Sequence, residues 1–193
     1  ADTTVQEKNI TYPTDVKLFI KIIDKCNKIA EKECVEQRQN YCRVVKSLLL
    51  LQRFRKHSKN VRKAKNAERK LKTIAGRLIR ELERKLTNEN LSHYSSELSL
   101  FKKVLDQQED GNHKIYSLHE PETLCISKGK DHKKYEFGTK ASCLLTKESG
   151  IIVGALDCRN SFDDRTLDEV IHQYDRLHNR KMKEIIGDRG YRG

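Results

Sequence analysis

Apolar residues recur at spacings of three and four through most of positions 14–110, which is the period of an amphipathic helix. The first such run, from Leu18 to Ile29, predicts a helix over about residues 14–33, with Thr14 or Asp15 as its N-cap. Further runs of the same period cover residues 41–54, 61–86 and 98–105. Because they lack the β-branched alternation of strands, we expect an antiparallel helical bundle or a long helical hairpin.

Short runs of β-forming residues flank this helical block. The first occupies residues 1–13 and stops at Pro13, which cannot continue a ladder of hydrogen bonds. Three more follow over residues 123–127, 139–146 and 151–158, and a tight turn at 148–150 joins the last two as a hairpin. An amphipathic helix over 166–177 and a last strand at Ile185 and Ile186 complete the order.

The order strand, helical block, three strands, helix and strand predicts an α/β fold, more closely an α+β mixed sheet with a helix packed on it. We divide the chain into three segments. Residues 1–13 are the first core strand, residues 14–112 are a helical insertion, and residues 113–193 are the rest of the core.

The charge of the chain is strongly positive and local. Its 193 residues carry 40 Lys plus Arg against 28 Asp plus Glu, a net charge of +12 with a pI near 9.4. Residues 43–85 alone hold sixteen basic and three acidic side chains, a net charge of +13. Because such a block repels itself, an acidic partner would relieve it, and we favour nucleic acid. A membrane surface, a ribosome contact or a plain solvated helix face is the alternative.

Two groups of basic residues are candidate DNA contacts. The first lies at the joint between two predicted helices and comprises Arg53, Arg55, Lys56, Lys59, Arg62, Lys63 and Lys65. The second precedes Tyr135 and Phe137 and comprises Lys130, Lys133 and Lys134. A basic segment beside aromatic rings can follow a DNA strand. It is equally a solvated connection with the two rings packed beneath it.

Nothing in the chain predicts a membrane protein or a metal–thiolate centre. No stretch approaches the roughly 20 apolar residues of a membrane span, and the N-terminus lacks the apolar core of a signal peptide. The six cysteines form no C-x-x-C pair and no zinc-like cluster. We therefore expect a cytoplasmic protein with reduced, mostly packed thiols.

Two aspartates stand at the ends of predicted strands. Asp2 opens the first strand and Asp188 closes the last. If these strands are neighbours, both carboxylates meet at one edge of the sheet, and such oxygen ligands suit Mg²⁺ or Mn²⁺. A lone Asp at a strand end is also common as a cap or turn residue, so spacing alone leaves this choice open.

Four segments in order resemble insertion-sequence transposases of the DDE class, in the bacterial group with a helical insertion after the first strand. They are ADTTVQEKNITYPTD, SLHEPETLCISKGKDHKKYEFGTKAS, TKESGIIVGAL and GDRGYRG. The resemblance covers essentially the whole chain. It implies a ribonuclease-H-like core whose three acids bind two Mg²⁺ or Mn²⁺ ions and which cuts and rejoins DNA.

The resemblance assigns roles to particular residues. Asp2 matches the first acid and Asp188 the second, and Arg189 and Arg192 flank the second acid, where guanidinium groups suit phosphates. The third acid, a glutamate, is expected beyond residue 193, and a further region is expected before the first strand. We therefore expect a fragment with little or no strand transfer on its own.

The partner implied by the resemblance is double-stranded DNA, as the terminal inverted repeats of the element and as target DNA. A homodimer is one option for the full-length form, and the expected location is the bacterial cytoplasm, at the nucleoid when DNA is bound. Two other hypotheses remain. The chain could be a catalytically dead remnant that acts only as a basic helical nucleic-acid-binding module, or a structural helical protein with incidental charge.

Overall fold

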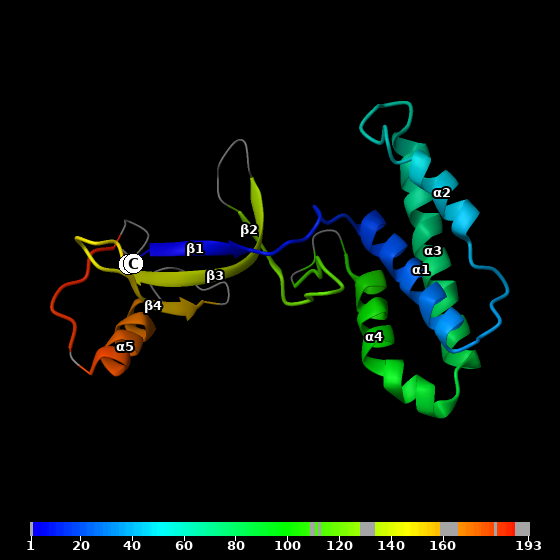
Figure 1. Cartoon of the computed structure of the whole chain (residues 1–193). Coiled ribbons are helices and arrows are strands. Elements are labelled where there is room, and N and C mark those ends of the chain that lie inside the picture. Colours follow the sequence, from blue (N-terminus) through cyan, green and yellow to red (C-terminus); the bar gives the residue numbers. More distant parts are fainter. Residues whose placement is uncertain are drawn as a thin grey trace. The chain divides into compact units, whose positions relative to one another are not determined.

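The structure, a computed structural model, describes residues 2–108, 111, 113–127, 134–158, 166–179 and 181–187. The chain divides into two compact units (Figure 1). A helical unit spans Thr11–Pro121, and a sheet unit combines Ala1–Ile10 with Glu122–Gly193. The helical unit is therefore inserted between the first strand and the rest of the sheet unit. The sequence analysis had placed this insertion at residues 14–112.

Four helices build the helical unit. They are α1 (Asp15–Lys32), α2 (Cys42–Leu50), α3 (Val61–Lys85) and α4 (Asn88–Asp106). Their apolar faces meet in one core, in which Ile22, Leu78 and Phe101 are completely buried. At the start of α1 the Thr14 hydroxyl accepts a hydrogen bond from the Lys17 N–H at 3.3 Å. Of the two caps that the sequence left open, Thr14 and Asp15, the structure has Thr14.

Two helix limits differ from the prediction. Helix α2 ends at Leu50, and residues 51–60 form a series of turns, which we call the tip loop. Helix α4 begins at Asn88, ten residues before the predicted run, because Thr87 caps it by accepting the Asn90 N–H at 3.3 Å. The polar first half of α4 is held by Tyr94, whose hydroxyl donates to Glu33 Oε1 at 2.7 Å.

The described strands of the sheet unit are antiparallel. They are β1 (Asp2–Glu7), β2 (Leu124–Ser127), β3 (Tyr135–Leu145) and β4 (Ile152–Asp157). Strand β3 is central: β1 pairs with one of its edges, and β2 and β4 pair with the other. Helix α5 (Leu167–His178) packs on β4, where Gln173 Nε2 donates to the Ala155 carbonyl at 2.7 Å. The combination of helices and a sheet agrees with the predicted class.

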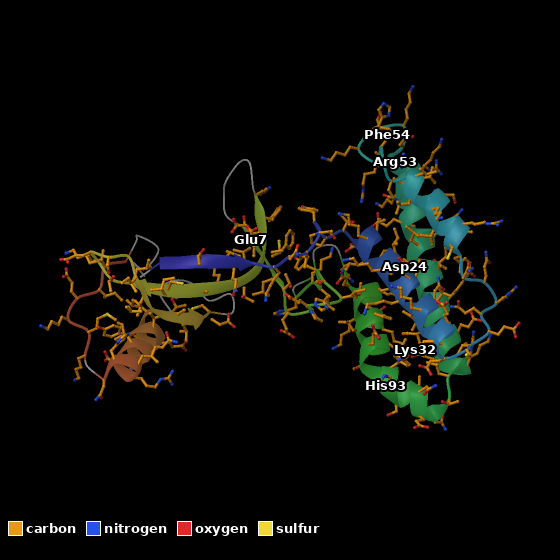
Figure 2. The ribbon with its side chains drawn as sticks, viewed as in Figure 1. Glu7, Asp24, Lys32, Arg53, Phe54 and His93 are labelled. Carbon is orange, nitrogen blue, oxygen red and sulfur yellow. The ribbon has the colours of Figure 1, made fainter. Side chains whose placement is uncertain are left out.

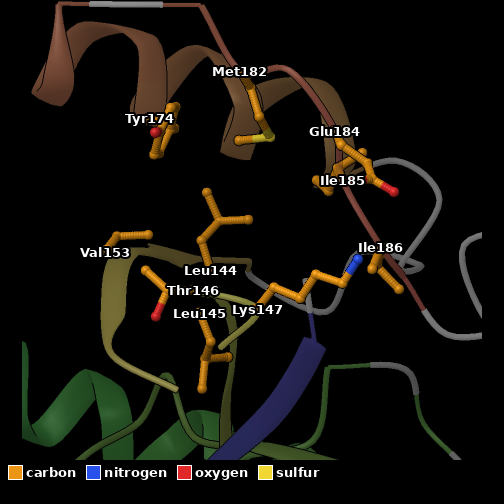
Figure 3. A pocket seen from close by; sticks show the side chains of 10 residues that line it. All are labelled: Leu144, Leu145, Thr146, Lys147, Val153, Tyr174, Met182, Glu184, Ile185 and Ile186. Atoms are coloured by element: carbon orange, nitrogen blue, oxygen red, sulfur yellow. The ribbon is translucent and has the colours of Figure 1, made fainter. Parts of the chain in front are cut away.

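The predicted last strand is wrong. Residues 181–187 form no strand, and Ile185 and Ile186 instead line a pocket of about 520 Å³ together with Leu144 and Val153 of the β3–β4 hairpin (Figure 3). Ile186 is 56% exposed there, so two adjacent isoleucines do not by themselves specify a strand. The sheet is antiparallel in its described part, whereas a mixed sheet was expected.

The start of β3 is also corrected. The sequence analysis placed this strand at 139–146, whereas it begins at Tyr135. Tyr135 and Phe137 therefore belong to the strand and pair with Ser127 and Cys125 of β2. The predicted strand started after Gly138, because glycine within a run of strand residues resembles a turn signal.

Within the described ranges, every helix is too short or too polar to cross a lipid bilayer.

Candidate nucleic-acid interface

The tip loop connects α2 to α3 and has a defined shape. Backbone hydrogen bonds between residues three apart hold it, including Arg55 N–H to the Gln52 carbonyl at 3.3 Å and His57 N–H to the Phe54 carbonyl at 3.0 Å. The Gln52 side chain also donates to the Ala64 carbonyl at 2.7 Å and so ties the loop to α3. The loop therefore presents its side chains from a fixed backbone.

The basic residues predicted at this joint lie on the surface. All seven are exposed, four of them on the tip loop and three in the first turns of α3. Their cationic groups therefore face solvent, where a phosphate backbone could reach them. This concentration of positive charge at one end of the helical unit is the geometry that a phosphate contact needs.

One of the seven differs from the others. The Arg55 guanidinium forms an ion pair with Glu68 of α3, with Nη2 and Oε2 3.3 Å apart. The pair is partly exposed, so water screens it and it contributes little to stability. It still offsets the charge of Arg55, which leaves this side chain less available to an external anion.

An exposed aromatic residue in the tip loop was missed by the sequence analysis. Phe54 is 68% exposed, and Figure 2 labels it beside Arg53 on the loop. It was assigned to the apolar face of the second helical run. The signal that could have revealed it is its position between Arg53 and Arg55, since a core-facing phenylalanine is rarely flanked by arginine on both sides. An exposed ring among cations can stack on a base or enter a base step.

The second predicted group lies in the sheet unit. Lys134 is exposed, and its ammonium group lies 5.5 Å from the centre of the Tyr135 ring, a cation–π distance. The Tyr135 side chain is 40% exposed. Lys130 and Lys133 lie outside the described residues.

Of the two predicted metal ligands, only Asp2 lies within the described residues. Asp2 is the first residue of β1 and stands opposite Cys143 of β3. Asp188, Arg189 and Arg192 lie outside the described residues. In the part of the chain that the structure does describe, no three His, Cys, Asp or Glu side chains are grouped closely enough to hold a metal ion. The pairing of Asp2 with Asp188 therefore stays a prediction.

The six cysteines are free thiols in the structure. Burial raises the pKa of Cys26, in the core of the helical unit, to about 12, and a nearby Glu97 carboxylate adds to this rise. Burial also raises the pKa of Cys158. Cys34 and Cys42 are exposed, so the expectation of mostly packed thiols holds for only part of the set. The buried thiols stay protonated at neutral pH and are unsuited to nucleophilic chemistry.

This chain shows little similarity to known proteins. No family model matches the chain, and no solved structure matches it. Over 58 residues it is 38% identical to an uncharacterized protein, ORF8 in the nfe locus, of Rhizobium meliloti. The similar stretch covers 30% of this chain and 28% of the length of that relative, whose name states no activity.

Proposed function

We propose that this chain acts in DNA transposition as an insertion-sequence transposase of the DDE class. The observation that carries the proposal is the place of the helical unit. It interrupts the sheet unit directly after β1, the strand that contains Asp2, and the sheet resumes at β2. This is the arrangement that the transposase resemblance implies, and the inserted unit carries the basic block.

The helical unit supports the DNA-binding half of the proposal. Its tip loop holds exposed Arg53, Lys56 and Lys59, and Arg62 and Lys63 follow on the first turn of α3. Each such side chain can neutralise one phosphate and release a condensed counterion. The contacts proposed here are to the phosphate backbone, which explains DNA binding without base specificity.

The sheet unit supports the catalytic half. Strands β1, β3 and β4 are antiparallel neighbours and α5 follows them, with the short β2 also paired to β3; apart from β2, this order agrees with the first part of a ribonuclease-H-like core. In such a core the next segment returns beside β1. The proposal requires Asp188 to come to this edge, close to Asp2. A divalent ion bound there would activate the attacking oxygen and stabilise the leaving oxygen of a phosphodiester.

A second candidate function is a nucleic-acid-binding module without catalysis. The observation that favours it is that the exposed basic residues belong to the described structure, whereas no cluster of three metal ligands does. Both candidates share the DNA-binding step, and they differ in whether Asp2 and Asp188 hold a metal ion.

The DNA-binding step is tested by fluorescence anisotropy with a labelled duplex at several salt concentrations. We expect affinity to fall steeply with salt. The triple variant Arg53→Gln/Lys56→Gln/Lys59→Gln should bind more weakly, with a slope of log affinity against log salt that is shallower by roughly 2–3, since each phosphate contact contributes about 0.9.

The matched control removes three exposed lysines elsewhere in the helical unit, Lys21→Gln/Lys28→Gln/Lys103→Gln. It lowers the net charge by the same amount but should keep most of the slope. If the control and the tip-loop variant behave alike, binding reflects net charge and not this interface. If the unaltered chain shows no salt-dependent binding to duplex DNA, the proposed function is wrong.

A further inference from the structure

A second group of arginines lies in the helical unit, away from the tip loop. Arg77, Arg80 and Arg84 of α3 and Arg38 of the α1–α2 connection line one pocket of about 640 Å³. Tyr41 and Glu81 also line it. We call this the arginine pocket. None of its members was among the residues predicted to contact DNA, although three of its arginines belong to the basic block of residues 43–85.

The fold holds the arginine pocket in a defined shape. Glu81 Oε1 accepts the backbone N–H of Arg38 at 2.9 Å, which fixes the α1–α2 connection against α3. At the other end of the connection, Asn27 of α1 donates to the Asn40 carbonyl at 3.0 Å. Gly76 leaves room for the Arg80 guanidinium, because a Cβ there would lie only 3.2 Å from Arg80 Nη1.

The single acid in the pocket does not neutralise its arginines. The Glu81 carboxylate accepts from Lys85 Nζ at 2.8 Å. This bond, the bond from the Arg38 N–H and the nearby charges of Lys85 and Arg84 lower its pKa, so it remains ionised and its single charge is shared between Lys85 and Arg84. Within the described residues, no hydrogen bond or ion pair is formed by the guanidinium groups of Arg38, Arg77, Arg80 and Arg84. Four guanidinium cations at one pocket repel each other, and a bound anion would offset this electrostatic repulsion.

The arginine pocket and the tip loop lie on the same face of α3. At 100° per residue, Arg62 and Arg80 point in the same direction, since they are eighteen residues apart. Between them, exposed Arg69 lies about 20° from this direction and exposed Lys70 about 80° from it, less than a quarter turn. The buried residues of α3, such as Leu71 and Leu78, lie on the other side. One basic stripe therefore runs along the helix.

The length of this stripe matches a DNA backbone. From Arg62 to Arg84 the helix rises about 33 Å at 1.5 Å per residue. Duplex DNA rises about 3.4 Å per base pair, so the stripe spans roughly ten base pairs, or one turn of the duplex. Guanidinium groups bind phosphate oxygens through two parallel hydrogen bonds, which suits the arginine-rich end of the stripe to a phosphodiester.

We propose that the arginine pocket binds a phosphodiester of duplex DNA that lies along α3, one helical turn of DNA away from the phosphates held by the tip loop. This inference rests on the proposed function for its ligand. It adds to the proposed function a second phosphate site and the length of DNA that the protein covers. Both claims can be disproved while DNA binding by the tip loop stands.

The test compares DNA hairpins with stems of about 6 and about 14 base pairs, the first shorter and the second longer than the roughly ten base pairs of the stripe. Affinity is measured by fluorescence anisotropy with the whole chain. We expect the longer stem to bind at least about ten-fold more tightly. In Arg77→Gln/Arg80→Gln/Arg84→Gln this advantage should vanish, and the salt slope for the longer stem should become shallower by roughly 2–3.

Two further variants serve as a charge-matched control and as a substitute for the triple variant. Lys21→Gln/Lys28→Gln/Lys103→Gln removes the same charge outside the stripe and should keep the advantage of the longer stem. Arg38→Gln changes only the connection, retains the backbone bond to Glu81, and should lose part of that advantage, so it serves if the triple variant does not fold.

The outcomes separate the two proposals. If the unaltered chain binds both stems equally, or if the pocket variants keep the full advantage, the arginine pocket is not a DNA site, while binding through the tip loop stands. If the unaltered chain binds neither stem, the proposed function fails and this inference fails with it.

Discussion

At the residue scale, the surface chemistry of the tip loop depends on which cations are already paired. Lys56 is exposed, and Arg55 beside it is exposed but bonded to Glu68. The sequence showed both as members of one basic cluster. It could not show the pairing, because Glu68 is thirteen positions away, and only the packing of the loop against α3 brings the two side chains together.

This pairing predicts unequal effects of single substitutions. Arg55→Gln should weaken binding to duplex DNA less than Lys56→Gln, because part of the Arg55 charge is already offset. Glu68→Gln should strengthen binding, since it releases the Arg55 guanidinium and removes a negative charge near the loop.

Anisotropy titrations at one low salt concentration measure all three variants. Glu89→Gln, an exposed acid in the first turn of α4, is the matched control for Glu68→Gln. Equal effects of Arg55→Gln and Lys56→Gln, or equal gains from the two glutamate variants, would contradict the role given to the ion pair.

At the element scale, the spacing of apolar residues predicted those helices whose limits are set by the local sequence. The limits of α1 and α3 agree with the prediction within a few residues, because each has a long apolar stripe and α1 has a capping threonine. The early start of α4 was missed since its first half is polar and depends on the bond from Tyr94 to Glu33. The strand at Ile185 and Ile186 was wrong because a short apolar run fits a pocket as well as a sheet.

The sheet has one position where a side chain cannot be added. At Gly138 of β3, a Cβ would lie 2.1 Å from the backbone oxygen of Gln6 in β1. Gly138→Ala must therefore push β1 away from β3 and should destabilise the protein by about 1–3 kcal/mol, the usual cost of overpacking. Hydrogen exchange of the β1 amides and the thermal unfolding midpoint measure the effect.

The control for this substitution is Gly154→Ala in β4. There a Cβ would meet the flexible end of Gln173 at 3.3 Å and Leu144 at 3.4 Å, both of which can shift. A Gly138→Ala protein with the same unfolding midpoint and β1 exchange as Gly154→Ala would show that β1 does not pair with β3 in this register.

At the scale of the whole molecule, one unit is inserted into the other along the chain. A basic helical unit interrupts a sheet unit just after the strand that contains Asp2. Charge counting alone located the basic block. It did not separate the tip loop from the arginine pocket, because Arg38 lies about forty positions before its partners on α3 and only the fold of the connection brings it to them.

The central claim of this account is that Asp2 and Asp188 hold one divalent ion. The most direct measurement is cleavage of the backbone by bound Fe²⁺ with ascorbate and peroxide, mapped by mass spectrometry, because Fe²⁺ can replace Mg²⁺ or Mn²⁺ at carboxylate sites. Asp24→Asn, at an exposed position of α1, is the control variant and should leave the pattern unchanged.

We predict cleavage near both residue 2 and residue 188, suppressed by excess Mg²⁺, and lost at both ends when either Asp2→Asn or Asp188→Asn is introduced. Cleavage that persists at one end after the other aspartate is replaced, or that Mg²⁺ does not suppress, would contradict a shared site.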